Sequence, residues 1–127
     1  MTDRDQKLVA LARMVYTGEA REQEIISPNI VWHVPGHNPV SGEYRESDYF
    51  EVMPARMAPL DRWEFEVQVV MVNGNYVVTQ IHLVGERKGK TIDTRGGHIL
   101  RFNANDQIVE GWGFTEKQDA LDEFFAA

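Results

Sequence analysis

The second half of the chain alternates apolar and polar side chains over long segments, and this pattern restricts the fold more than any other feature. From Trp63 to Met71 every second residue is apolar, which is typical of a β-strand with one buried face. Asn73-Gly74-Asn75 then predicts a hairpin turn, with 76–87 as the partner strand. Further strands are expected over 91–102 and 107–114. The second half is therefore predicted to be an antiparallel meander.

The first half is predicted to be mainly helical. Apolar residues recur with helical spacing from Asp3 to Tyr16, and Gly18 follows where a helix commonly ends. A second short helix is expected over 19–26, and a strand over 30–34, with Trp32 and His33 on opposite sides. Helices followed by a meander indicate an α+β fold rather than a parallel sheet.

The strand that ends near His33 leads into a stiff loop. Pro35, Gly36, Asn38 and Pro39 follow, and these residues interrupt regular pairing. Such a junction can hold an ionisable ring at the mouth of a cavity. The alternative is that His33 only caps backbone groups.

A short helix is expected to begin at Ser47, and Pro54 should end or kink it. The segment from Met53 to Pro59 is expected to be irregular. It is either a lid over a cavity or a loop packed on the core, because methionine often fills gaps in cores. The tail from Glu116 to Phe125 carries apolar residues that close over the core.

Length and composition indicate one domain, 1–127, of a globular protein. Of the 127 residues, 43% are hydrophobic and 26% charged, and no apolar run is long enough to span a bilayer. The N-terminal residues lack the pattern of a secretion signal, and the absence of cysteine is compatible with a reducing cytoplasm. A net charge of −7 disfavours nucleic acid as a partner. We expect a cytoplasmic protein with no membrane segment.

Three motifs together resemble a known family. They are W-H-x-P-G from Trp32, N-P-x-S-G-x-Y from Asn38, and R-F-x5-I-V-E-x-W-x-F from Arg101. With the order of elements, they resemble the SnoaL-like branch of the NTF2-like superfamily, which includes polyketide cyclases, ketosteroid isomerases and limonene epoxide hydrolases. The resemblance implies a cystatin-like α+β roll, an NTF2-like cone: a strongly bent mixed or antiparallel sheet, wrapped by N-terminal helices around an apolar pocket. It also implies a homodimer formed through the outer face of the sheet.

Comparison with ketosteroid isomerase suggests roles for two histidines. His33 stands where that enzyme has its aspartate base, and His98 stands where it has a protonated aspartate that donates to the oxyanion. Imidazole suits both roles, because its pKa lies near neutral pH. The alternative is that both are buried structural rings. The tyrosine of that oxyanion site corresponds to Leu11, which disfavours steroid isomerisation.

One position of the sequence argues against two other activities of the superfamily. The cyclases carry a catalytic aspartate directly after the tryptophan of the last strand, where this chain has Gly113. Limonene epoxide hydrolases require an Asp-Arg-Asp set. Asp93 and Arg95 are present, but the last-strand aspartate is again replaced by Gly113.

The remaining site predictions concern an orienting acid, the cavity walls and metal ions. Asp93 either orients a histidine or is a solvated partner of Arg95 or Lys90. The substrate-binding walls are predicted to be Trp32, Tyr44, Met57 and Trp112, although aromatic residues at strand spacing are often core. His33 and His37 are separated by a Pro-Gly turn, a spacing unsuited to zinc. We expect no metal and no cofactor, and place His82 on the face opposite the pocket.

The leading hypothesis is a cofactor-independent acid–base enzyme of isomerase, cyclase or dehydratase type, acting on an apolar, oxygenated small molecule. His33 would be the base, His98 the oxyanion donor and Asp93 an orienting group. The alternative is a ligand-binding or dimerisation module without catalysis. Protein binding of the nuclear-transport kind is less favoured, because the WHVPG junction suits a pocket better.

Overall fold

The computed structural model describes residues 1–17 and 22–127, which form helices and one sheet. Their order and bounds are α1 (Asp3–Thr17), α2 (Glu22–Ile25), β1 (Ile26–Val34), β2 (Gly42–Arg45), α3 (Ser47–Met57), β3 (Arg62–Asn73), β4 (Tyr76–Arg87), β5 (Lys90–Phe102), β6 (Ile108–Thr115) and α4 (Gln118–Phe124). The predicted α+β class and the meander over β3 to β6 are confirmed. No helix among the described residues has the length and apolar character needed to cross a bilayer.

The six strands form one mixed sheet in the order β2-β1-β6-β5-β4-β3. Strands β3 to β6 pair with their sequence neighbours in antiparallel fashion, as the hairpin signals predict. Strand β1 instead pairs with β6 in parallel, so that Trp32 lies beside Gly111 and His33 beside Trp112. The parallel pair places the loop after β1 next to the last strand.

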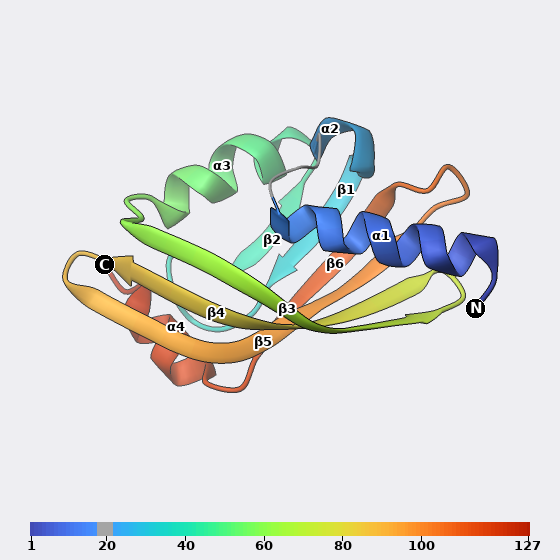
Figure 1. Ribbon diagram of the computed structural model, residues 1–127. Helices are drawn as coiled ribbons and strands as arrows, with labels where there is room; N and C mark the ends of the chain where they lie inside the picture. Colours follow the sequence, from blue (N-terminus) through green and yellow to red (C-terminus); the bar gives the residue numbers. More distant parts are fainter. Residues whose placement is uncertain (18–21) are drawn as a thin grey trace.

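One face of the bent sheet carries the core. In Figure 1, α1 and α3 lie on the same side of the strands. Alternation along each strand sends one set of side chains to this inner face. The largest core cluster includes Leu8 and Ala12 of α1, Trp32, Tyr49, Val77, Leu100 and Phe102. A smaller cluster contains Val40, Ile92, Phe124 and Phe125, and it anchors α4 at one end of the sheet.

The structure differs from the sequence prediction at Pro54. The sequence predicts that Pro54 ends or kinks the helix, and an end at Pro54 is ruled out, because α3 continues to Met57. Proline removes one donor from the helix, but the Ala58 N–H still donates to the Pro54 carbonyl at 3.1 Å and closes the last turn. Part of the segment expected to be irregular is therefore helical.

The connection between the first helix and the first strand also differs. Strand β1 begins at Ile26, earlier than expected, and includes Pro28. The register with β6 shifts between Ile26 and Val31, which is where a strand tolerates a residue without an N–H. Of the helix expected over 19–26, the part from Glu22 to Ile25 is observed as α2. Gly18 and residues 19–21 lie outside the described residues.

Candidate functional site

An apolar cavity of about 340 Å³ lies between the inner face of the sheet and the helices. Residues of α1, α3, α4 and five strands, β1 and β3 to β6, line it. Its apolar lining is formed by Val15, Trp32, Met53, Met57, Trp63, Phe65, Ile81, Leu83, Leu121 and Phe125. This size and lining are typical of a small-molecule site, in which a few polar groups fix the orientation of a ligand.

His98 is the ionisable ring on the cavity wall. It lies on β5, and its neighbours across the strands are Thr79 on β4 and Gly113 on β6. Its Nδ1 atom is hydrogen-bonded to the hydroxyl of Tyr16, which in turn is 2.6 Å from Thr79 Oγ1. The backbone N–H of His98 donates to the same Thr79 oxygen at 3.1 Å. A helix and two strands thus fix the ring.

The His98 ring is neutral at physiological pH. One part of it lines the cavity, while protein atoms surround the rest, and this burial lowers its pKa to about 4. Burial likewise raises the pKa of Tyr16, so the phenol keeps its proton, although its bond to Thr79 opposes the shift. The site therefore offers uncharged donors and acceptors.

The second nitrogen of His98, Nε2, is available to a ligand. Among the described residues it has no hydrogen bond to the protein. In the same part of the chain, no buried side-chain nitrogen or oxygen lacks a partner. Nε2 is therefore accessible, and because His98 lines the cavity, it faces that space.

Two glycines on β6 shape the wall beside these rings. A Cβ atom on Gly111 would lie 2.3 Å from Cζ3 of Trp32, so the indole occupies the space that a side chain would need. A Cβ atom on Gly113 would lie 3.8 Å from His98 Nε2 and 3.4 Å from Pro35, which are ordinary contacts. Gly113 therefore leaves open space directly beside His98.

The prediction that His33 and His98 face each other across the pocket is wrong. Strands β1, β6 and β5 are in register here, with His33 opposite Trp112 and His98 opposite Gly113. Adjacent residues of a strand point to opposite faces, so the His33 ring lies on the outer face, although His33 is among the residues that border the cavity. There it stacks on Trp112, with ring centroids 5.4 Å apart.

On the outer face, His33 belongs to a polar cluster. Its Nε2 is 2.8 Å from Glu110 Oε2, and its Nδ1 is 3.7 Å from Glu43 Oε1. Arg101 donates to the other oxygen of Glu110 at 3.0 Å. The hydrogen bond from His33, with a smaller contribution from Arg101, lowers the pKa of Glu110.

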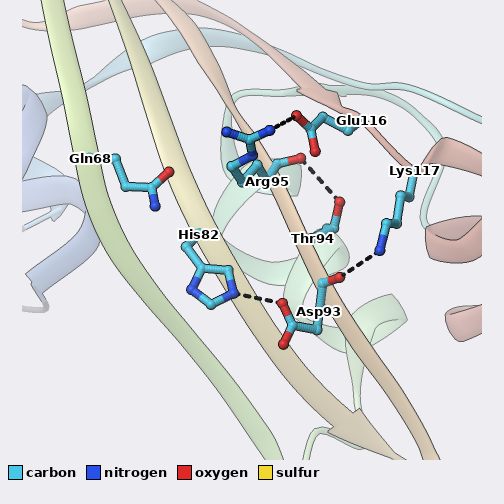
Figure 2. A pocket seen from close by; sticks show the side chains of 7 residues that line it. All are labelled: Gln68, His82, Asp93, Thr94, Arg95, Glu116 and Lys117. Carbon is cyan, nitrogen blue, oxygen red and sulfur yellow. Dashed lines mark hydrogen bonds and ion pairs between the residues drawn. The ribbon is translucent and has the colours of Figure 1, made fainter.

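Asp93 contacts a histidine, but not one of the cavity. Its carboxylate is 2.6 Å from Nε2 of His82, in place of the predicted partners Arg95 or Lys90. Figure 2 shows this pair in a shallow groove that Gln68, Arg95 and Glu116 also line. His82 is thus on the face opposite the cavity, as predicted. A role for Asp93 beside His33 or His98 is excluded by this placement.

Two of the four predicted wall residues line the cavity. Trp32 and Met57 do so, and the Trp32 ring lies 5.1 Å from the ring of His98. Tyr44 is instead buried in the core, where its hydroxyl donates to the Val40 carbonyl at 2.6 Å. Trp112 lies on the outer face. The prediction of Tyr44 and Trp112 as walls is therefore wrong.

The sequence prediction does not include Tyr16. The resemblance points to Leu11 for the helix tyrosine, and Leu11 packs against the core instead of lining the cavity. Leu8 and Ala12, fully buried, precede Tyr16 by eight and four positions. Residues with this spacing share one helix face. The spacing is the signal that places Tyr16 toward the sheet.

Metal-ligating side chains do not gather in the part of the chain that the structure describes. No group of three or more histidine or acidic side chains there is placed to hold an ion. His37, the second candidate ligand, uses its backbone N–H to bind Asp122 Oδ1 at 3.1 Å.

Comparison with known proteins identifies relatives of this cavity-bearing fold. The family model described as SnoaL-like domain matches residues 11–111. A search of curated proteins found no match. Among solved structures, a cystatin-like protein of unknown function from Xanthomonas campestris is similar at a TM-score of 0.82 and 24% identity, covering 94% of this chain and 98% of that chain.

Two further structures share the fold. An NTF2-like protein from Burkholderia thailandensis E264 has a TM-score of 0.75 and 23% identity, with 92% of each chain covered. A protein from Jannaschia sp. CCS1, proposed to be a SnoaL-like polyketide cyclase, has a TM-score of 0.77 and 17% identity. It covers 100% of this chain and 97% of that chain. At these identities the likeness concerns the fold.

Proposed function

Because the chain belongs to the SnoaL-like domain family and has its NTF2-like fold, we propose that its cavity binds an apolar small molecule carrying an oxygen and promotes an acid–base step at that molecule. The observation that carries this proposal is the His98 ring, held by Tyr16 at Nδ1 and open to an apolar cavity at Nε2. No cofactor is part of the proposal. The reaction type is isomerisation, cyclisation or dehydration.

The chemistry follows from a neutral imidazole in an apolar space. When a C–H next to a carbonyl loses its proton, negative charge develops on the carbonyl oxygen. A hydrogen bond from His98 would stabilise that charge, as neutral donors do in oxyanion sites. The proton goes to water, because no carboxylate is among the described residues that line the cavity. His33 plays no part as base in this scheme.

A direct test measures hydrogen exchange in a simple ketone. The protein is incubated with 1-indanone in D₂O, and deuterium uptake at the carbon next to the carbonyl is followed by NMR. We expect the wild-type protein to accelerate uptake, and His98→Leu, which has no donor at this position, to lose about a hundredfold or more of that acceleration. His33→Ala serves as the matched control and should retain it. Equal rates for the wild type and His98→Leu would refute acid–base catalysis at His98.

The second candidate is a binding module without catalysis. The low pKa of His98 favours it, because an imidazole that resists protonation is a weak base at neutral pH. In that case 1-indanone binds to the cavity and shifts the NMR signals of its lining residues, but no deuterium is taken up.

We also propose that a second copy of the chain covers the outer face of the sheet. Apolar side chains form a row across four strands there: Met71, Val78, Ile99 and Trp112. Met71 is 59% exposed and Phe114, close to the row, is 42% exposed, which is unusual for an isolated surface. The ion pairs Arg95–Glu116 and Arg101–Glu110 flank the row, and each combines charges of both signs. Ile99→Glu should convert a dimer into a monomer in analytical ultracentrifugation.

A further inference from the structure

The hydroxyls of Tyr16 and Thr79 can be linked to His98 in two ways. Tyr16 has one proton and two neighbours, Thr79 Oγ1 at 2.6 Å and His98 Nδ1. If the phenol donates to Nδ1, the imidazole proton is on Nε2 and points into the cavity. If Nδ1 carries the proton and donates to the phenol, Nε2 is an acceptor. The two arrangements present opposite hydrogen-bonding characters to a ligand.

The distances around Thr79 distinguish the two arrangements. In the first, the Thr79 proton goes to the Tyr16 oxygen at 2.6 Å, while Thr79 Oγ1 accepts from the His98 backbone N–H at 3.1 Å. In the second, Tyr16 donates to Thr79 Oγ1. The Thr79 hydroxyl can then donate only to the His98 carbonyl oxygen, which is 3.4 Å away. That length is at the limit of a hydrogen bond. In the first arrangement both hydroxyl protons therefore have short contacts, and the Nε2 proton is left for a ligand.

We infer that Tyr16, supported by Thr79, holds His98 with its proton on Nε2, so that the cavity selects a neutral ligand through a hydrogen-bond-accepting oxygen, above all a carbonyl. This inference rests on the proposed function and specifies its substrate class. Tyr16 and Thr79 are positioning residues in this scheme, because they act through His98.

Neutrality of the ligand follows from the rest of the lining. The described residues of the cavity wall include no aspartate, glutamate, lysine or arginine. A charged ligand group would lose its hydration without gaining an ionic partner, which is costly. Phosphates, carboxylates and ammonium compounds are therefore poor ligands. A ketone, a quinone or a lactone of one or two rings fits the cavity and accepts from Nε2.

The position of the proton can be measured without any ligand. The two ring nitrogens of His98 have well separated ¹⁵N shifts, depending on which one carries the proton. We expect the wild-type spectrum near pH 7 to show a protonated Nε2 and an accepting Nδ1. In Tyr16→Phe, which keeps the ring packing on Phe65, the Nδ1 signal should move to that of a nitrogen without a donor, and a fraction of Nδ1–H should appear.

Tyr76→Phe provides the matched control. Tyr76 is 44% exposed and lies outside this network, so the proton of His98 should stay on Nε2 in this variant. A wild-type proton on Nδ1 would overturn the inference, as would an identical His98 spectrum in Tyr16→Phe. A change of the same size in Tyr76→Phe would also overturn it. These spectra are independent of turnover, so this inference can fail while deuterium exchange succeeds, and the reverse.

Ligand selection is tested with two bicyclic probes of similar size. 1-Indanone only accepts a hydrogen bond, whereas indole only donates one through its N–H. We expect 1-indanone to bind about fivefold or more tightly than indole in an NMR titration, the worth of one hydrogen bond. The preference should be lost in His98→Leu. Tighter binding of indole by the wild-type protein, or an unchanged preference in His98→Leu, would overturn the inference.

Discussion

His33 and His98 lie on opposite faces of one sheet, although each is paired with a neighbouring residue of β6. His98 faces the cavity and has Tyr16 as its partner, whereas His33 is hydrogen-bonded to Glu110 outside it. The two rings therefore have separate electrostatic surroundings. Substitutions at the two positions should have effects that do not depend on each other, as expected for distant sites without shared partners.

Replacing His33 should change the outer face and leave the cavity as it is. His33→Ala removes the hydrogen bond that contributes most to the low pKa of Glu110, so that pKa should rise toward its ordinary value. A ¹³C NMR titration of the Glu110 carboxyl measures this change. The affinity for 1-indanone should stay within about twofold of the wild type, since the hydrogen bond to the ligand is unchanged. A large loss of affinity would place His33 in the ligand site.

His98 should make the protein less stable in mild acid. Its pKa is about 4 in the folded state and about 6.5 in an unfolded chain. Between these values the unfolded state binds more protons than the folded state. The contribution of His98 to the free energy of unfolding is therefore constant above about pH 6.5 and is lost as the pH falls toward 4. The loss is on the order of 3 kcal/mol, which is an upper bound.

The measurement is chemical unfolding at several pH values. His98→Gln has no titrating ring, so its free energy of unfolding should fall less than that of the wild type between pH 6.5 and pH 4. Other acid-sensitive groups, such as Asp106 and Asp122, are common to both proteins and cancel in the difference. Parallel curves for the two proteins would show that His98 is protonated as easily when folded as when unfolded.

The two glycines of β6 should respond differently to the same added methyl group. In Gly111→Ala the Cβ atom collides with the Trp32 ring, which must move. We expect a loss of about 1–3 kcal/mol in the free energy of unfolding, the usual cost of overpacking. Gly113→Ala meets only ordinary contacts and should cost less, while narrowing the cavity beside His98. Denaturant unfolding compares the pair, and equal losses would contradict the collision at Trp32.

Gly113→Asp should alter the chemistry of the cavity. Its Cβ position lies 3.8 Å from His98 Nε2, so a carboxylate there can accept a hydrogen bond from the ring. A nearby negative charge favours the imidazolium, and the pKa of His98 should rise. A ¹H–¹³C NMR titration of the His98 ring reports this shift, with Gly113→Asn as the uncharged control. A rise of the same size in Gly113→Asn would show that charge is not the cause.

Arg87 should be important for stability because it joins two segments at one end of the sheet. It is buried, and its guanidinium donates to the carbonyls of Phe124, Pro59 and Ala58 at 3.1 to 3.4 Å. Arg87→Met leaves these acceptors unpaired, and we expect a loss of about 2–4 kcal/mol. Arg62→Met, on the exposed surface, should leave the unfolding midpoint nearly unchanged. A stable Arg87→Met protein would show that water satisfies the carbonyls.

The strands and their order in the meander were predictable from the sequence, because alternation and the Asn-Gly turn specify them locally. The parallel pairing of β1 with β6 has no local signal, and neither does the burial of Arg87. Likewise, α3 continues past Pro54, where Met53 and Met57 pack against the core clusters. Tertiary contacts decide these features, so they could not be predicted from the pattern of the sequence alone.

One local rule, strand alternation, explains an error in the prediction of the candidate site. Strand alternation places Trp32 and His33 on opposite faces, so both could not line the same cavity with their side chains. The prediction includes both, whereas the His33 ring contacts Trp112 and Glu110 on the outer face. The resemblance to a family points to His98, whereas its partner Tyr16 is visible in the helical spacing after Leu8 and Ala12.

The parallel contact between β1 and β6 has a consequence for synthesis of the protein. A ribosome releases β1 long before β6, so one edge of β1 emerges without its partner. During that interval Ile30 and Trp32 lack part of their final packing, and the cavity has no closed wall. Such exposed apolar edges are where nascent chains aggregate or engage chaperones. A polypeptide interrupted before Ile108 would hold every residue of the His98 network and still lack the strand that completes the cavity.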